Sequence, residues 1–241
     1  MTASRDAHPE LWVANLGQIP YREATAMQEE IRTARQAGRI PDSLLLLEHP
    51  PVYTKGRRSE RRDLPMGEDW YLMQGIEIVA ADRGGRVTYH GPGQLVGYPI
   101  MGIGDVLAYL RTMERSIIAA LADEGIEAEV REGLTGVWAG ERKIGSIGVH
   151  VSRGVTTHGF AVNVTNDLQP FEWIVPCGIE GVQMTSVCRE TGRADALPCF
   201  RRRIAWRFVE AFGLRQRLVS PERLLRRARE GVAPEPEPVS A

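Results

Sequence analysis

Cysteine is scarce in this chain of 241 residues, occurring only as Cys177, Cys188 and Cys199. An odd number of thiols does not provide a disulfide framework, and such frameworks belong to oxidising compartments. The three cysteines also lie too far apart to resemble the closely spaced ligands of a zinc site. We therefore expect free thiols, no metal site and the reducing environment of the cytoplasm.

Long hydrophobic runs and an excess of one charge are missing too. Residues 1–10 are polar and charged, without the apolar core of a signal peptide. The apolar run 44–47 is far too short to cross a bilayer. The formal net charge is -1, so no overall field attracts nucleic acid or an anionic membrane. We expect a cytoplasmic protein that binds neither nucleic acid nor a membrane.

The chain does contain a succession of helical and β-prone segments. Its hydrophobic fraction of 43% is sufficient for a large core. Apolar residues at helical spacing predict helices over 21–36, 106–124, 200–212 and 221–230. The β-prone segments are 43–49, 76–81, 87–90, 94–98, 126–130, 135–139, 142–151 and 155–165.

Several of these strands follow one another without an intervening helix. This pattern predicts an α+β fold, a mixed β-sheet flanked by helices. No internal repeat or linker is visible, so we expect one domain over residues 1–241, with its core at about 10–220. The charged, irregular segment 55–69 predicts a mobile surface loop. Residues 231–241, rich in proline and glutamate, predict a disordered tail.

A glycine-rich segment, residues 82–94, lies between β-prone pieces. Glycine permits close approach of a ligand or of another backbone segment. Arg83 is a candidate anion-binding group, and His90 can donate or accept a proton. The segment lacks both the Gly-Lys-Ser/Thr ending of a P-loop and the spacing of a dinucleotide-binding loop. A plain glycine-rich hairpin is an equally good interpretation of these features alone.

Lys143 opens a strand that continues with Gly145, Ser146 and Gly148. The small side chains leave one face open for a chain-like substrate. A lysine at such a position is usually a solvated residue, and a functional role requires a partner. A nearby thiol would be such a partner, because an ammonium group favours the thiolate form.

Cys177 lies between Pro176 and Gly178, which restrict the backbone on one side and free it on the other. This turn is suited to presenting a thiol, whereas Cys188 and Cys199 are typical of packing or surface thiols. A thiolate attacks an acyl thioester readily, because thiol exchange is nearly isoenergetic.

Taken together and in order, these blocks resemble the lipoyl(octanoyl) transferase family. The match runs over about residues 12–190. The matching residues are 48–50, 52–54, 83–94, 143–148, 158–163 and 176–178. The resemblance implies a catalytic domain with the fold shared by biotin and lipoate ligases, a mixed sheet flanked by helices.

The resemblance also implies an activity that requires no cofactor. Members transfer an octanoyl group from octanoyl-acyl carrier protein to a lysine of lipoyl domains. The acceptors are the acyltransferase subunits of 2-oxoacid dehydrogenases and the glycine cleavage H protein. Cys177 falls on the family's acyl-thioester nucleophile in a ping-pong mechanism, and Lys143 on the partner that favours its thiolate. The implied acyl-pocket residues are Arg83, Gly84, Gly85, Arg86, Val87, Thr88, Tyr89, His90, Ser146, Ile147, Gly148, Gly159, Phe160 and Ala161.

Three other interpretations stay open. An ATP-dependent lipoate or biotin ligase would use the same fold without a cysteine nucleophile. A cysteine hydrolase would combine Cys177 with His158 and Asn163, which are otherwise supporting or structural residues. A binding protein with redox-sensitive thiols would have no catalytic activity at all.

The arginines of the 55–69 segment are candidates for steering an acidic partner protein. They are Arg57, Arg58, Arg61 and Arg62. A solvated loop balanced by its own acidic residues is an equally good interpretation.

Overall fold

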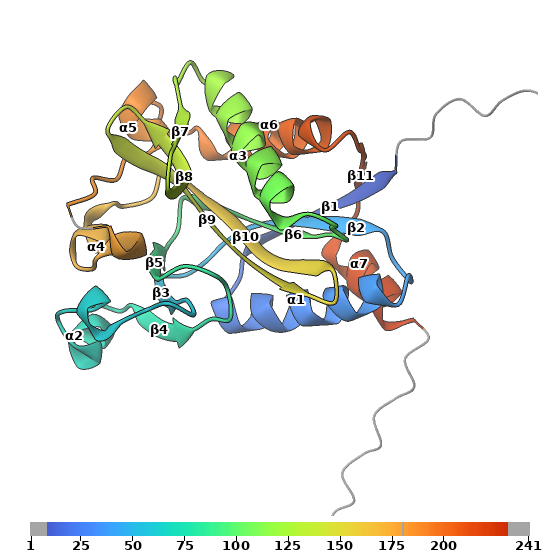
Figure 1. Ribbon diagram of the computed structural model, residues 1–241, viewed down its shortest axis with the longest axis horizontal. Coiled ribbons are helices and arrows are strands. Elements are labelled where there is room, and N and C mark those ends of the chain that lie inside the picture. Colours follow the sequence, from blue (N-terminus) through green and yellow to red (C-terminus); the bar gives the residue numbers. More distant parts are fainter. Residues whose placement is uncertain (1–8, 180, 231–241) are drawn as a thin grey trace, which may run out of the picture.

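The computed structural model describes residues 9–179 and 181–230, which form two β-sheets and the helices packed on them (Figure 1). The strands of the larger sheet are β1 (Glu10–Gln18), β2 (Asp42–Glu48), β6 (Gln94–Ile100), β7 (Glu129–Arg131), β8 (Leu134–Ala139), β9 (Arg142–Ser152), β10 (Val155–Asn163) and β11 (Arg215–Leu218). The strands of the smaller sheet are β3 (Val52–Lys55), β4 (Glu77–Ala80) and β5 (Val87–His90). The helices are α1 (Tyr21–Gln36), α2 (Glu68–Met73), α3 (Val106–Ala122), α4 (Gln169–Glu172), α5 (Val187–Thr191), α6 (Leu197–Ala211) and α7 (Pro221–Arg229), with the 3₁₀ turns η1 (Arg61–Asp63) and η2 (Pro176–Gly178).

The larger sheet has the order β11-β1-β2-β6-β10-β9-β8-β7, and the smaller has the order β4-β3-β5. Strand β1 pairs in parallel with β2 and β11, while the pairs from β2 through to β7 are antiparallel. The sheet is therefore mixed, and helices flank it, as the sequence predicts. None of the described helices is long and apolar enough to pass through a bilayer.

The leucine run of β2 is buried on both faces of the larger sheet. Leu44 and Leu46 join the core under α3 and α6, and Leu45 and Leu47 join the core over α1 and α7. Successive side chains of a strand point to opposite faces, so a strand that is covered on both faces has a continuous run of apolar residues in its sequence. Figure 1 shows the two helix pairs on opposite sides of this sheet.

The smaller sheet has its own aromatic core, separate from the two cores of the larger sheet. It includes Tyr53, Tyr71, Val87, Tyr89 and Phe171. The phenol of Tyr53 donates to the carbonyl of Pro170, and that of Tyr71 donates to the carbonyl of Trp173. These bonds fasten the segment that leads into η2 to the smaller sheet.

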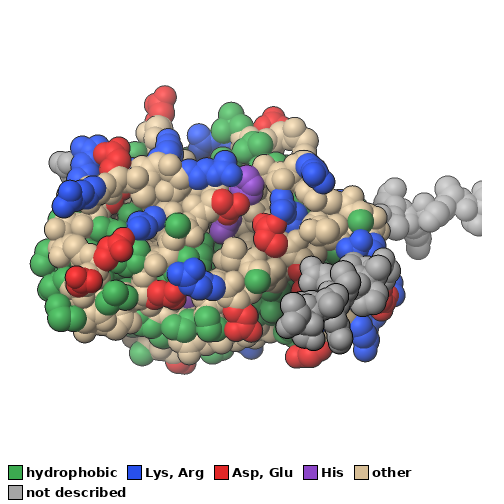
Figure 2. All heavy atoms as spheres, turned by 90° about the horizontal axis from the view of Figure 1, so that it is seen from below, with side chains coloured by type: hydrophobic (Ala, Val, Ile, Leu, Met, Phe, Trp, Pro, Cys, Tyr) green, Lys and Arg blue, Asp and Glu red, His purple; other side chains and the backbone are tan. Residues whose placement is uncertain are grey.

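Both signs of charge are interspersed over the face seen in Figure 2, with histidine side chains visible between them. This mixture agrees with the formal net charge of -1. On this face, the described residues form no large region of a single charge.

One expectation from the sequence is wrong, and some elements are missed. The irregular mobile loop expected at 55–69 contains η1 and the start of α2, and its Asp63 is fully buried. The strands β1, β3 and β11 and the short helix α5 carry too little periodic signal to be expected. The expected tail, 231–241, lies outside the described residues, and the single-domain organisation stays a prediction.

Strands β6 and β10 approach closely where two glycines meet. A Cβ on Gly159 would lie 2.2 Å from the carbonyl oxygen of Gly97, closer than real Cβ atoms come to backbone. A Cβ on Gly97 would lie 2.2 Å from the ring of Phe160, its cross-strand partner. Only glycine fits at either position.

We predict that Gly159→Ala lowers the free energy of unfolding by about 1–3 kcal/mol, because backbone atoms must move to admit the methyl group. Urea unfolding monitored by circular dichroism measures this change. Gly104→Ala is the matched control, because a Cβ there meets nothing within 4 Å. Equal stability of the two variants would contradict the close approach.

Candidate active site

The thiol of Cys177 is presented by the turn η2, in a backbone conformation rare for a residue with a side chain. Its φ is 57° and its ψ is 12°, in the left-handed region. Gly178 follows with a φ of 72°. Such strain persists where the surrounding structure holds it, and it is concentrated at functional sites.

Lys143 lies in β9, and its backbone is fixed on both sides. Its N–H donates to the carbonyl of Gln183 over 2.8 Å, and its carbonyl accepts from the N–H of Thr185 over 2.9 Å. The side chain is buried, with only 1% of its surface exposed. Residues 183–185 follow η2 in the chain, so this pairing brings the Cys177 turn beside β9.

The ammonium group of Lys143 faces the thiol of Cys177. Its Nζ lies 3.4 Å from Sγ of Cys177 and 3.1 Å from the carbonyl oxygen of Thr135. The hydroxyl of Ser146 lies 4.0 Å from the same sulfur. No carboxylate within residues 9–179 and 181–230 forms an ion pair with Lys143. The Cys177 thiol is therefore the one group in contact with this ammonium group that can carry a negative charge.

Two residues around this ammonium group were not expected from the sequence. A Cβ on Gly136 would lie 2.8 Å from Cε of Lys143 and 2.5 Å from the carbonyl oxygen of Gly145. The glycine therefore makes room for the lysine side chain, and the neighbouring Thr135 supplies a carbonyl acceptor. A glycine inside a β-prone segment is the signal that could have indicated this close approach.

A cavity of about 350 Å³ opens beside the dyad and is lined from both sheets. Its volume lies in the range of small-molecule pockets. The apolar wall includes Leu110, Ile147, Phe160 and Ala161. The two blocks expected to form the pocket, 146–148 and 159–161, are direct cross-strand partners in β9 and β10.

All the expected acyl-pocket residues line this cavity except Val87 and Tyr89. Strand β5 alternates, so Thr88 and His90 face the cavity while Val87 and Tyr89 pack into the aromatic core of the smaller sheet. Cavity-lining residues that the sequence did not indicate are Tyr21, Arg58, Tyr98, Leu110, Gly133, Leu134, Thr135, Val149 and Ile179.

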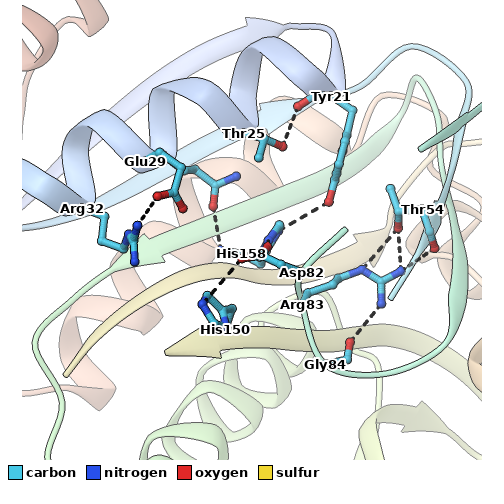
Figure 3. A network of polar contacts seen from close by, with 11 residues as sticks. Tyr21, Thr25, Glu29, Arg32, Thr54, Asp82, Arg83, Gly84, His150 and His158 are labelled. Atoms are coloured by element: carbon cyan, nitrogen blue, oxygen red, sulfur yellow. Dashed lines mark hydrogen bonds and ion pairs between the residues drawn. The ribbon is translucent and has the colours of Figure 1, made fainter. Parts of the chain in front are cut away.

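His158 belongs to a polar network in the cavity wall, which Figure 3 shows between α1, β10 and the glycine-rich segment. Its Nε2 lies 2.5 Å from Oδ1 of Asp82, and its Nδ1 lies 3.4 Å from the phenol of Tyr21. The bond from His158 holds the pKa of Asp82 at about 2. Burial raises the pKa of Tyr21 to about 12.

Asn163 lies outside the cavity lining and is a packed polar residue. Its side-chain amide donates to the carbonyl of Thr185 over 3.0 Å and accepts from Gln94 over 2.9 Å. Neither His158 nor Asn163 forms a hydrogen bond with Cys177 among the described residues. The arrangement therefore differs from a Cys-His-Asn triad, in which the histidine contacts the thiol.

Arg83 is a second buried cation in the cavity wall. Its guanidinium donates to the carbonyl and hydroxyl oxygens of Thr54 and to the carbonyl of Gly84. Burial lowers its pKa below the ordinary value. Its hydrogen-bond acceptors are neutral, so the charge contributes a positive potential to the cavity.

Two buried histidines lie next to this network. Burial lowers the pKa of His49 to about 4, although Nδ1 donates to the carbonyl of Ile19 and Nε2 lies 2.7 Å from the phenol of Tyr98. Burial also holds the pKa of His90 well below its usual range. Both rings are neutral in the folded protein at neutral pH. Within the described part of the chain, no group of three or more His, Cys, Asp or Glu residues is placed to hold a metal ion.

We predict that the protein loses stability as the pH falls from about 6.5 to about 4. The unfolded chain binds protons at His49 and His90 in this window while the folded protein does not, so unfolding is favoured by about 1.4 kcal/mol per pH unit for each histidine. Urea unfolding across the window measures the slope.

His49→Gln should remove part of this pH dependence, since one of the two buried titrating groups is gone. His150→Gln is the control, because the His150 side chain is 18% exposed and lies at the rim of the network. A free energy of unfolding that stays constant over this window would show that the buried histidines are not held neutral.

The chain is similar to known proteins over most of its length. Residues 20–209 match the model of the lipoyl protein ligase A/B catalytic domain. The octanoyltransferase of Syntrophotalea carbinolica is 46% identical over 200 residues, which is 81% of this chain and 92% of the relative. That of Koribacter versatilis is 42% identical over 235 residues, covering 90% of this chain and 94% of the relative.

Solved structures show the same fold at low sequence identity. A bi-partite lipoate protein ligase from Thermoplasma acidophilum superposes with a TM-score of 0.71 at 20% identity, over 92% of each chain. Lipoate-protein ligase A bound with ATP gives a TM-score of 0.66 at 19% identity, over 91% of this chain and 93% of that one. With the family model and the octanoyltransferases, these matches show that the chain belongs to the octanoyltransferase family of the lipoyl protein ligase A/B catalytic domain.

Proposed function

We propose that this protein transfers an octanoyl group to a lysine of lipoyl domains through a thioester on Cys177. The observation that carries this proposal is the contact of 3.4 Å between the buried ammonium group of Lys143 and the Cys177 thiol. The name of the curated relatives, octanoyltransferase, indicates that the acyl group is octanoyl. The cavity beside Lys143 and Cys177 offers space to bind it.

In the first step the thiolate attacks the carbonyl carbon of an octanoyl thioester, and the donor's thiolate leaves. One thioester replaces another, so the step needs positioning and thiolate formation more than it needs activation of the leaving group. Lys143 supports the attacking thiolate and can donate a proton to the donor's departing thiolate. The apolar wall of Leu110, Ile147, Phe160 and Ala161 contacts the acyl chain.

In the second step a neutral lysine amine of the acceptor attacks the acyl-enzyme. An amide forms, the Cys177 thiolate leaves, and the amine loses a proton to Lys143 or to water. The product is stable because an amide is much less reactive than a thioester. The reaction uses no cofactor.

The donor in this proposal is octanoyl-acyl carrier protein. The acceptors are lipoyl domains of 2-oxoacid dehydrogenase acyltransferase subunits and the glycine cleavage H protein. One of the structural neighbours was solved as a lipoate protein ligase and its E2 lipoyl domain, which supports a lipoyl-domain acceptor. Arg58 lines the cavity and Arg57 precedes it, so this part of the 55–69 segment is a candidate contact for an acidic donor. With three unpaired cysteines, we place the reaction in the cytoplasm.

The geometry supports the two rival enzymes less well. A ligase would not need a thiol opposite a buried lysine. A hydrolase would need a histidine at the thiol, whereas His158 is bonded to Asp82. The other thiols, Cys188 and Cys199, lie outside the cavity lining.

We predict that octanoyl-acyl carrier protein adds one octanoyl group to the enzyme without ATP. Intact-mass spectrometry measures the adduct, and hydroxylamine should remove it, since it is a thioester. Cys177→Ser should abolish the adduct, and Cys188→Ser is the matched control that should retain it. An adduct that persists in Cys177→Ser, or one that requires ATP, would contradict the proposal.

We predict further that the isolated octanoyl-enzyme passes its acyl group to a lipoyl domain. The lipoyl domain should gain an octanoyl group on lysine that resists hydroxylamine, since the new bond is an amide. Mass spectrometry of the mixture follows both proteins at once. Release of free octanoate, with the lipoyl domain left unmodified, would favour the hydrolase instead.

A further inference from the structure

A buried ion pair lies beneath the nucleophile turn. Asp63 in η1 is fully buried, and Arg86, which precedes β5, is 16% exposed at its side chain. Nη2 of Arg86 lies 2.7 Å from Oδ1 of Asp63, and Nε lies 3.0 Å from Oδ2. The contact through Nε is a hydrogen bond and the contact through Nη2 is an ion pair, and Nη2 also lies 3.1 Å from Oε2 of Glu60. The hydrogen bond to Asp63 raises the pKa of Arg86 above its usual value.

This pair contacts the turn on both sides of Cys177. On one side, the N–H of Val175 donates to the backbone carbonyl of Asp63 over 3.1 Å. On the other, a Cβ on Gly178 would lie 2.2 Å from Cδ of Arg86 and 2.6 Å from its Nε. The arginine side chain therefore lies directly across the backbone of Gly178.

The turn needs such support because of its backbone conformation. Cys177 has a φ of 57°, which is unfavourable for a residue with a Cβ. Within the turn, Gly178 donates to Val175 and Ile179 donates to Pro176, each over 3.1 Å. A small rotation at Cys177 would move the sulfur away from Lys143, so these supports decide where the thiol lies.

We propose that Asp63 and Arg86 are positioning residues for the nucleophile, and that their ion pair holds the 175–178 turn so that the Cys177 thiol stays opposite Lys143. The catalytic meaning of this inference rests on the proposed function. The position and the reactivity of the Cys177 thiol can be measured without any acyl substrate.

The test compares Asp63→Asn and Arg86→Gln with the wild type in two assays. Alkylation of Cys177 by iodoacetamide should slow, and its pH dependence should move to higher pH. The kcat for octanoyl transfer should fall on the order of 10–100-fold. For Asp63→Asn the KM for the acyl donor should change little, because Asp63 does not line the cavity.

Two further variants separate positioning from general stability. Arg86→Lys keeps a charge and a stem over Gly178, so it should recover part of the alkylation rate. Glu124→Gln is the matched control, because the Glu124 side chain is also fully buried and pairs with Arg193 over 2.7 Å and Arg203 over 2.8 Å, outside the cavity lining. It should lower the melting temperature and leave the alkylation of Cys177 unchanged.

Wild-type alkylation and kcat in Asp63→Asn and Arg86→Gln would overturn the proposal. It would also fail if Glu124→Gln slowed alkylation as much as Asp63→Asn at the same loss of melting temperature. Should Asp63→Asn not fold, Arg86→Gln decides the question alone, since Arg86 is partly exposed. If the wild type never accepts an octanoyl group, the proposed function fails. The alkylation assay still tests whether Asp63 and Arg86 position the Cys177 thiol.

Discussion

A buried ammonium group that pairs with no carboxylate of residues 9–179 and 181–230 is the constraint on which the rest of the site depends. Removing an amine from water while it stays charged is costly unless an anion or several acceptors compensate it. Around Lys143 the described structure offers the carbonyl of Thr135, the ring of Trp138 with its centroid 5.6 Å from Nζ, and the Cys177 thiol. Of these three, only the thiol can become an anion.

The surrounding fold keeps these two groups together although they are far apart in the sequence. Gly136 leaves space for the lysine side chain, and the pairing of Lys143 with residues 183–185 returns the chain after the Cys177 turn to β9. The turn itself is supported from the smaller sheet, through Asp63 and Arg86. The two side chains therefore meet at the boundary between the two sheets, and the cavity opens at the same boundary.

Much of this arrangement could be predicted from the sequence, for identifiable reasons. Helix α1 and the strands β5, β9 and β10 have strong periodic or β-prone patterns, and the helix over 106–124 is confirmed as α3. The blocks that resemble the family pointed to the segments lining the cavity, which the structure brings together from β5, β9 and β10. The alternation of β5 then explains why Thr88 faces the cavity and Tyr89 does not.

The missed features depend on contacts between distant residues. Asp63 looked solvated because its sequence neighbours are charged, but Arg86 pairs with it from 23 positions away. The edge strand β11 is mostly exposed and has no apolar alternation, so only its pairing with β1 reveals it. Likewise, Thr135 and Gly136 contact Lys143 across a strand pair, and the glycine signals a close approach without showing which residue approaches.

The most direct test of the central claim is a pH titration of the thiolate absorbance in the ultraviolet, with the Cys177→Ser spectrum subtracted. It compares the wild type with Lys143→Met, which keeps the length of the side chain and removes its charge. If the ammonium group supports the thiolate, the signal of Cys177 should persist to lower pH in the wild type than in Lys143→Met. Superimposable titration curves would contradict the account, because the buried lysine would then have no influence on the thiol that it faces.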